Sequence, residues 1–196
     1  MPASVIFLIS DDASQTASND NHIRLPQAFT DGNWTVHIGA PERLTLTPEG
    51  LTVDGFALHK ADLIWPLGFG SRAGFLDRAH LLRQLPQDKL ISPIAEHVLG
   101  HGKAQWSEYC PPTYVSNDAA YLKRFAKEFG GDWVLKPLAG SYGRDVHHVQ
   151  SNQSGIICDV MQEQPRSYFA LQRFIAGIIE GEVRTLVAGG QIIGSY

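Results

Sequence analysis

Long apolar runs, clusters of basic residues and paired cysteines are all missing from this sequence of 196 residues. The apolar run at residues 5–9 follows no basic stretch and is too short for a signal peptide or a membrane span. No segment concentrates Lys and Arg and the formal net charge is −4, so we expect no nucleic-acid partner. No apolar segment approaches the length needed to span a bilayer, so we expect no membrane partner. Cys110 and Cys158 form no CxxC motif, and we interpret them as reduced thiols of a cytoplasmic protein.

Strand and helix patterns alternate through the first hundred residues. Continuous apolar runs predict strands at 5–9, 34–38 and 62–67, with shorter hairpin strands within 44–59 and a brief one at Leu90-Ile91. Helices are expected at 22–29 and after Ser71, which we predict to cap a helix that ends at Pro86. This alternation predicts a small, Rossmann-like α/β layer with a parallel sheet over residues 1–104.

Past residue 104 the pattern changes to one of hairpins and isolated helices. We predict a helix capped by Asn117 and ended by Gly130-Gly131, and a second helix at 154–162. Strands are expected around them at 113–115, 133–136, 146–149, 168–174, 182–188 and 191–195. Residues 105–196 are therefore predicted to form an α+β domain.

The segment 132–149 carries the most chemical information. Lys136 projects from an otherwise apolar strand, where an ammonium without an anionic partner is costly. Pro137 holds it in an extended conformation, and the small-residue loop 139–144 that follows can turn several backbone amides toward one phosphate. One reading is a nucleotide held under a hairpin; the other is a plain glycine-containing hairpin with a solvated lysine. A Walker A loop is excluded because GxxxxGK[ST] is absent.

Lys-Pro-Leu and its glycine loop resemble the KPL-x-G-x-GG signature of bacterial glutathione synthetases and their ATP-grasp relatives. Segments further along resemble that family in the same order. They are residues 171–175, where the family's main chain reads the adenine edge, 179–184 and 187–193. Upstream, residues 91–94 and Lys103 resemble its asparagine-proline segment and its earlier ATP-binding lysine. The resemblance implies a pre-ATP-grasp domain at 1–104 and the first part of an ATP-grasp domain at 105–196.

The resemblance also implies an ATP-dependent carboxylate–amine ligase that works through an acyl phosphate and uses Mg²⁺. Its partners would be ATP and a small carboxylate and amine. The implied ATP-binding residues are Lys103 and Lys136 at the phosphates, Gly140, Ser141 and Gly143 in a lid, Gln172, Arg173, Phe174 and Ile175 around the adenine, and Glu182. Arg184, expected on the same strand face as Glu182, would be the catalytic group at the transferring phosphoryl or the activated carboxylate. The alternative is a solvent-facing ion pair of Glu182 and Arg184 on that strand.

Two departures from the family bear on function. The acidic metal ligands of glutathione synthetases lie on strands later than residue 196, so Mg²⁺ ligands are not expected in this chain, which would be a fragment or be completed by a partner. Residues 65–70 replace the family's substrate loop. An incomplete sheet exposes an edge, so we predict self-association into a homo-oligomer or local disorder near 180–196. Two alternatives to a ligase stay open: a catalytically inactive nucleotide-binding or assembly module, and an unrelated cytoplasmic α/β protein.

Overall fold

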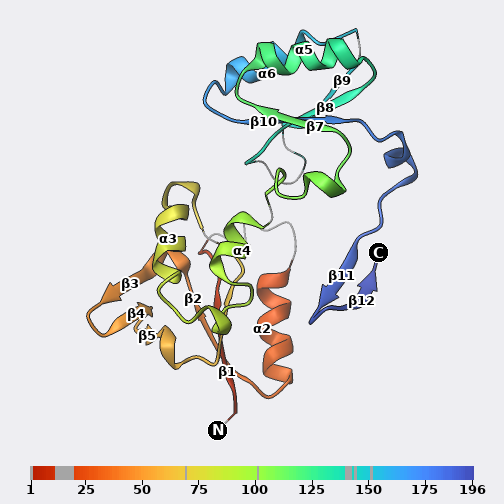
Figure 1. Cartoon of the computed structure of the whole chain (residues 1–196). Coiled ribbons are helices and arrows are strands. Elements are labelled where there is room, and N and C mark those ends of the chain that lie inside the picture. The colour runs from red at the N-terminus through yellow and green to blue at the C-terminus, as the bar shows by residue number, and fades with distance from the viewer. Residues whose placement is uncertain are drawn as a thin grey trace. The chain divides into compact units, whose positions relative to one another are not determined.

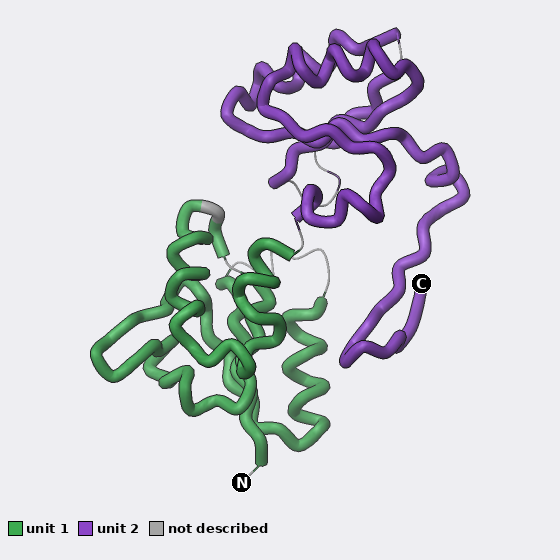
Figure 2. Tube along the Cα trace, in the orientation of Figure 1, with its two compact units in different colours: residues 1–101 green, residues 102–196 purple. Residues whose placement is uncertain are grey.

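The computed structural model describes residues 2–11, 20–68, 70–100, 102–139, 143, 145–150 and 152–196. The chain divides into two compact units, residues 1–101 and 102–196 (Figure 2). Each unit has its own cluster of buried apolar side chains. The predicted fold class, an α/β layer followed by an α+β unit, is confirmed by the two sheets described below. That these units correspond to functional domains divided at residue 104 stays a prediction.

A three-stranded parallel sheet forms the centre of unit 1. β1 (Ser4–Leu8) lies between β2 (Thr35–Gly39) and β6 (Leu63–Pro66), and α2 (Asn21–Asp31) connects the first two strands (Figure 1). Val5 to Leu8 are buried, as a strand covered on both faces requires. The three predicted strands and the first helix are confirmed.

The rest of unit 1 is an antiparallel meander and short helices. β3 (Leu44–Thr47), β4 (Gly50–Val53) and β5 (Phe56–Ala57) pair in that order, and α3 (Phe75–Leu82) and α4 (Ile94–Leu99) follow in the chain. The predicted cap at Ser71 is wrong: a 3₁₀ turn at Arg72–Gly74 intervenes, so α3 begins after Gly74. The expected strand at Leu90 is reduced to a single bridge to Ile64.

Unit 2 has a four-stranded antiparallel sheet covered by helices on one face. Its strand order is β7 (Thr113–Ser116), β10 (Phe169–Arg173), β8 (Trp133–Pro137) and β9 (His147–Val149). α5 (Ala119–Phe129) and α6 (Ile156–Glu163) lie side by side on that face (Figure 1). Trp133 and Leu135 belong to the core beneath these helices, whereas Lys136 is half-buried, so the lysine faces the opposite, open side of the sheet.

The cap of α5 differs from the sequence expectation. Asp118, and not Asn117, accepts hydrogen bonds from the amides of Ala120 (2.9 Å) and Tyr121 (3.2 Å). Asp118 has the extended backbone of an N-cap, which lets its carboxylate fold back onto the first turn. The helix ends as predicted, with Gly130 at a φ of 54°.

The last element of unit 2 is an exposed hairpin of β11 (Thr185–Ala188) and β12 (Gln191–Ser195), which follows a 3₁₀ segment at Ala176–Glu180. The predicted start of the first strand at residue 182 is wrong. β11 begins at Thr185, and Arg184 just before it exchanges both main-chain hydrogen bonds with Tyr196, at 2.8 and 3.0 Å. Among the described residues, no helix combines the length and the apolar character needed to cross a bilayer.

Candidate functional site

The open face of the unit 2 sheet holds a chain of hydrogen bonds centred on Gln172. Lys136 Nζ donates to Gln172 Oε1 at 2.8 Å, and Gln172 Nε2 donates to Thr113 Oγ1 at 2.8 Å. Thr113 Oγ1 in turn donates to the carbonyl oxygen of Pro111 at 2.7 Å. The strand register explains this arrangement, because β10 lies between β7 and β8 and pairs Gln172 with Thr113 on one side and Val134 on the other.

Lys103 joins the same region from outside the sheet. Its Nζ donates to the carbonyl oxygen of Pro137, the residue after Lys136, at 2.5 Å. Burial lowers the pKa of Lys103, and the positive charge of Lys136 lowers it further. Because the charge of Lys136 affects the pKa of Lys103, the two ammonium groups lie in the same region. The structure thus brings together the two lysines that the sequence analysis assigned to ATP.

Both ammonium groups donate to neutral oxygens, an amide and a main-chain carbonyl. A neutral acceptor positions an ammonium without cancelling its charge, whereas a carboxylate would do both. Two ammonium groups brought into one region favour an anionic ligand with several negative charges. This electrostatic arrangement is what a polyphosphate requires.

The proposed adenine segment divides between the two faces of the sheet. Gln172 faces the open side, but the side chain of Arg173 lies on the other side: it donates to the Gly130 carbonyl oxygen at 2.6 Å and lies over the Trp133 ring. The Phe174 ring lies 4.4 Å from the His148 ring, centroid to centroid, and Ile175 is exposed. Contact of residues 172–175 with a nucleotide stays a prediction. The side chain of Arg173 already contacts Gly130 and Trp133 on the helix-covered face.

The proposed lid is described only in part. Gly140 and Ser141 lie outside the described residues. Gly143 occupies a turn with a φ of 69°, a conformation that glycine adopts without strain. A Cβ at this position would meet nothing within 4 Å, so backbone conformation, not space, favours glycine here.

Glu182 and Arg184 pair with each other in solvent. Their carboxylate and guanidinium lie 2.7 Å apart, and both side chains are more than half exposed. They precede β11, so the expectation that both sit on a strand is wrong. Among the described residues, neither Glu182 nor Arg184 forms a hydrogen bond or ion pair with Lys136 or Gln172. The catalytic role of Arg184 stays a prediction.

Sequence reasoning missed the contributions of Thr113 and His148. The sequence indicated Thr113 only as part of a strand, although its hydroxyl accepts a hydrogen bond from Gln172. This contact could be found only from the pairing of their two strands, because the two residues are 59 positions apart in the sequence. His148 lies 3.2 Å from the Asp132 carboxylate, across the β8–β9 pair. The part of the chain that the structure describes contains no group of three or more His, Cys, Asp or Glu side chains able to hold a metal ion.

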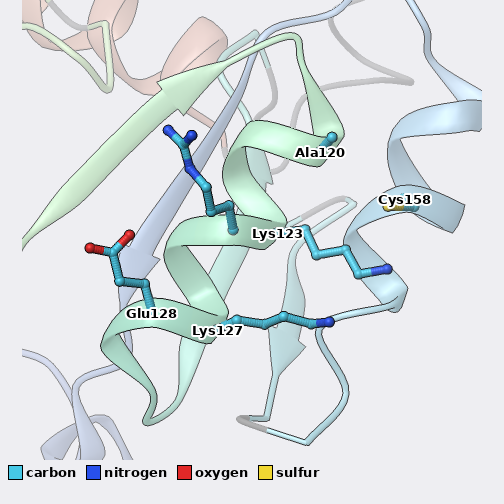
Figure 3. Close-up of a pocket in the computed structure, with 6 residues that line it drawn as sticks. Ala120, Lys123, Lys127, Glu128 and Cys158 are labelled. Atoms are coloured by element: carbon cyan, nitrogen blue, oxygen red, sulfur yellow. The ribbon is translucent and has the colours of Figure 1, made fainter.

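A hollow of about 570 Å³ lies on the helical side of unit 2. It is lined by Ala120, Lys123, Arg124, Lys127, Glu128 and Cys158. The ammonium groups of Lys123 and Lys127 point toward α6, which carries Cys158, while the carboxylate of Glu128 points away from it (Figure 3). Because α5 separates this hollow from the open face, we treat it as distinct from the lysine site.

Comparison with known proteins agrees with this architecture. Residues 102–196 match the family described as prokaryotic glutathione synthetase, ATP-grasp domain. The chain is 30% identical over 194 residues to a glutathione synthetase of Parasynechococcus marenigrum, covering 91% of the chain and 56% of that relative. It is 41% identical over 83 residues to a glutathione synthetase of Xanthomonas axonopodis pv. citri, covering 41% of the chain and 26% of that relative.

Solved structures share the fold at lower identity. A RimK domain ATP-grasp protein from Sphaerobacter thermophilus aligns with a TM-score of 0.70 at 20% identity, over 98% of this chain and 72% of that one. A D-cycloserine synthetase aligns with a TM-score of 0.69 at 15% identity, over 92% and 62% of the two chains.

These matches support an ATP-grasp protein, with the ATP-grasp domain at residues 102–196. Within that class the chain is a glutathione synthetase-like protein. It spans little more than half the length of the first relative and about a quarter of the second.

Proposed function

We propose that this chain is part of an ATP-dependent carboxylate–amine ligase of the glutathione synthetase type, and that the open face of unit 2 holds the nucleotide. The observation that carries the proposal is the pair of lysines, Lys103 and Lys136, each positioned by a neutral oxygen. The family match over residues 102–196 supports it, because it covers the whole unit in which these lysines lie.

The proposed chemistry matches these groups. A carboxylate is a poor electrophile, so the γ-phosphoryl group of ATP is transferred to its oxygen, which gives an acyl phosphate and ADP. The nitrogen of an amine then attacks the acyl carbon and phosphate leaves with the bonding electrons. Phosphoryl transfer depends mainly on positioning and charge stabilisation. Lys103 and Lys136 would neutralise the phosphates, and Arg184 would stabilise the charge that develops on the transferred group.

The described residues do not fit a magnesium site of their own. Mg²⁺ prefers several oxygen ligands, and the described part of the chain has no group of three or more His, Cys, Asp or Glu side chains able to hold a metal ion. We therefore propose that Mg²⁺ enters with the nucleotide.

The second candidate is a nucleotide-binding or assembly module without ligase activity. The same lack of a metal-holding group among the described residues favours it, as does the mutual pairing of Glu182 and Arg184. Release of ADP on addition of amino acids and short peptides, the small carboxylates and amines that we propose as partners, separates a ligase from such a module.

Calorimetric titration with Mg·ATP tests the nucleotide site in both cases. Lys136→Ala should raise the Kd about 10- to 100-fold, because a charge-assisted hydrogen bond contributes about 1.5–3 kcal/mol. Lys123→Ala removes an equal charge from the helical side of the same unit and should change the Kd by less than about twofold. No binding by the unchanged protein, or equal weakening by both variants, would overturn the proposal.

Two further properties belong to the proposal. We propose a cytoplasmic protein, in keeping with two cysteines that form no disulfide. We also propose self-association through the exposed hairpin, because both of its strands have exposed apolar side chains. Sedimentation velocity at several concentrations tests the second property, and a monomer at all of them would contradict it.

A further inference from the structure

The hydrogen-bond chain that ends at Lys136 has only one consistent direction. A threonine hydroxyl has one proton, and the carbonyl oxygen of Pro111 can only accept. The proton of Thr113 is therefore given to Pro111, and Thr113 can only accept from Gln172. The Gln172 amide must present its NH₂ group to Thr113, which leaves its oxygen facing Lys136.

The opposite orientation of the amide would be unfavourable at both ends. Its NH₂ group would face the Lys136 ammonium, so two donors would meet. Its oxygen would face a threonine hydroxyl whose proton is already engaged with Pro111. All three side chains are at least half-buried, where an unsatisfied polar group costs more than it does in water.

We propose that Thr113 is a positioning residue of the nucleotide site: its hydroxyl fixes the Gln172 amide so that the amide oxygen holds the Lys136 ammonium in place. This inference rests on the proposed function. A lysine side chain has high rotational freedom, and a fixed acceptor limits the entropy that is lost when phosphate binds. The remaining N–H bonds of Lys136 then stay directed to the open face.

The test compares Thr113→Val with Thr113→Ser. Valine keeps the shape and removes the hydroxyl, while serine keeps the hydroxyl. We expect Thr113→Val to raise the Kd for Mg·ATP about three- to tenfold and Thr113→Ser to stay within about twofold of the unchanged protein. Thr35→Val, at an exposed strand position of unit 1, is the matched control and should have no effect.

A double-mutant cycle separates positioning from a general loss of stability. If Thr113 acts through Gln172, then Thr113→Val should have no further effect on the Kd once Gln172→Ala is present. Additive effects of the two changes, or a lowered melting temperature without any change in Kd, would overturn the proposal.

A measurement without nucleotide keeps this inference distinct from the proposed function. Mass spectrometry after brief treatment with acetic anhydride reports how readily Lys136 reacts. Thr113→Val should raise that rate at least about twofold, toward the rate in Gln172→Ala, because the ammonium loses its fixed acceptor. If the unchanged protein binds no ATP, the proposed function fails, and an unaltered Lys136 rate in Thr113→Val would then overturn the positioning role as well.

Discussion

The guanidinium carbon of Arg173 lies 4.0 Å from the centre of the Trp133 ring. The same guanidinium donates to the Gly130 carbonyl oxygen at 2.6 Å, and Trp133 Nε1 donates to that oxygen at 3.0 Å. Arg173 thus joins β10 to the end of α5 on the helix-covered face of the sheet. Its side chain serves the fold of unit 2, although the neighbouring Gln172 faces the proposed nucleotide.

Arg173→Ala should therefore destabilise the protein and leave nucleotide binding nearly unchanged. Loss of the cation–π contact and of a charge-assisted hydrogen bond should lower the free energy of unfolding by about 1–3 kcal/mol. Urea unfolding followed by circular dichroism measures this change. The Kd for Mg·ATP should stay within about twofold.

Arg166→Ala, at an exposed position before β10, is the control and should alter the free energy of unfolding by less than about 0.5 kcal/mol. A tenfold loss of ATP affinity in Arg173→Ala, without loss of stability, would instead place this side chain in the nucleotide site.

The alternation of side chains along a strand could have separated Gln172 from Arg173 in advance. Successive residues of β10 face opposite sides, so both could not face the adenine. The same alternation places Lys136 and the buried Leu135 on opposite faces of β8, as the structure has them. The link from Thr113 to Gln172 could not be predicted in this way, because it depends on which strand becomes the neighbour of β10.

The main elements of the fold were predictable where local pattern and tertiary packing agree. β1 is a continuous apolar run that is buried on both faces, and its limits were predicted to within one residue. The start of β11 was not predictable, because it depends on where Tyr196 pairs with Arg184. Asn117 and Asp118 are equally good caps by residue type, so only the backbone conformation selects one of them.

Substitution of these two neighbours distinguishes the true cap of α5. Asp118→Ala removes the acceptor of two amide hydrogen bonds and should lower the free energy of unfolding by about 1 kcal/mol. Asn117→Ala should cost less than about 0.5 kcal/mol. Urea unfolding of both variants measures the difference, and a larger cost for Asn117→Ala would show that the helix begins one residue earlier.

Gly131 is constrained by its backbone and by Arg173. Its φ is 68°, and a Cβ on it would lie 2.4 Å from Arg173 Nη1. Gly131→Ala should lower the free energy of unfolding by about 1–3 kcal/mol, the sum of backbone strain and displacement of the guanidinium. In the Arg173→Ala background only the strain remains, so the added cost should fall to about 1 kcal/mol. Equal costs in both backgrounds would show that the guanidinium does not restrict this site.

The lowered pKa of Lys103 predicts proton uptake when ATP binds at alkaline pH. Burial and then the charge of Lys136 place the folded pKa below the unfolded one. The charged form of Lys103 therefore costs stability at lower pH, and this cost disappears as the pH rises through the folded and then the unfolded pKa. A bound phosphate favours the charged form, so it should restore the proton that the free protein has begun to lose.

Calorimetry of ATP binding in alkaline buffers with different ionisation enthalpies measures this uptake. The window lies below the ordinary lysine pKa of about 10.4, where the phosphates of ATP are already fully ionised. Lys103→Arg is the control, because a guanidinium keeps its charge throughout this range and should bind ATP without taking up a proton. Equal proton uptake by Lys103→Arg and the unchanged protein would assign the proton to another group. Loss of uptake in Lys103→Arg, with its affinity for ATP retained, would show that Lys103 binds the phosphates as a cation.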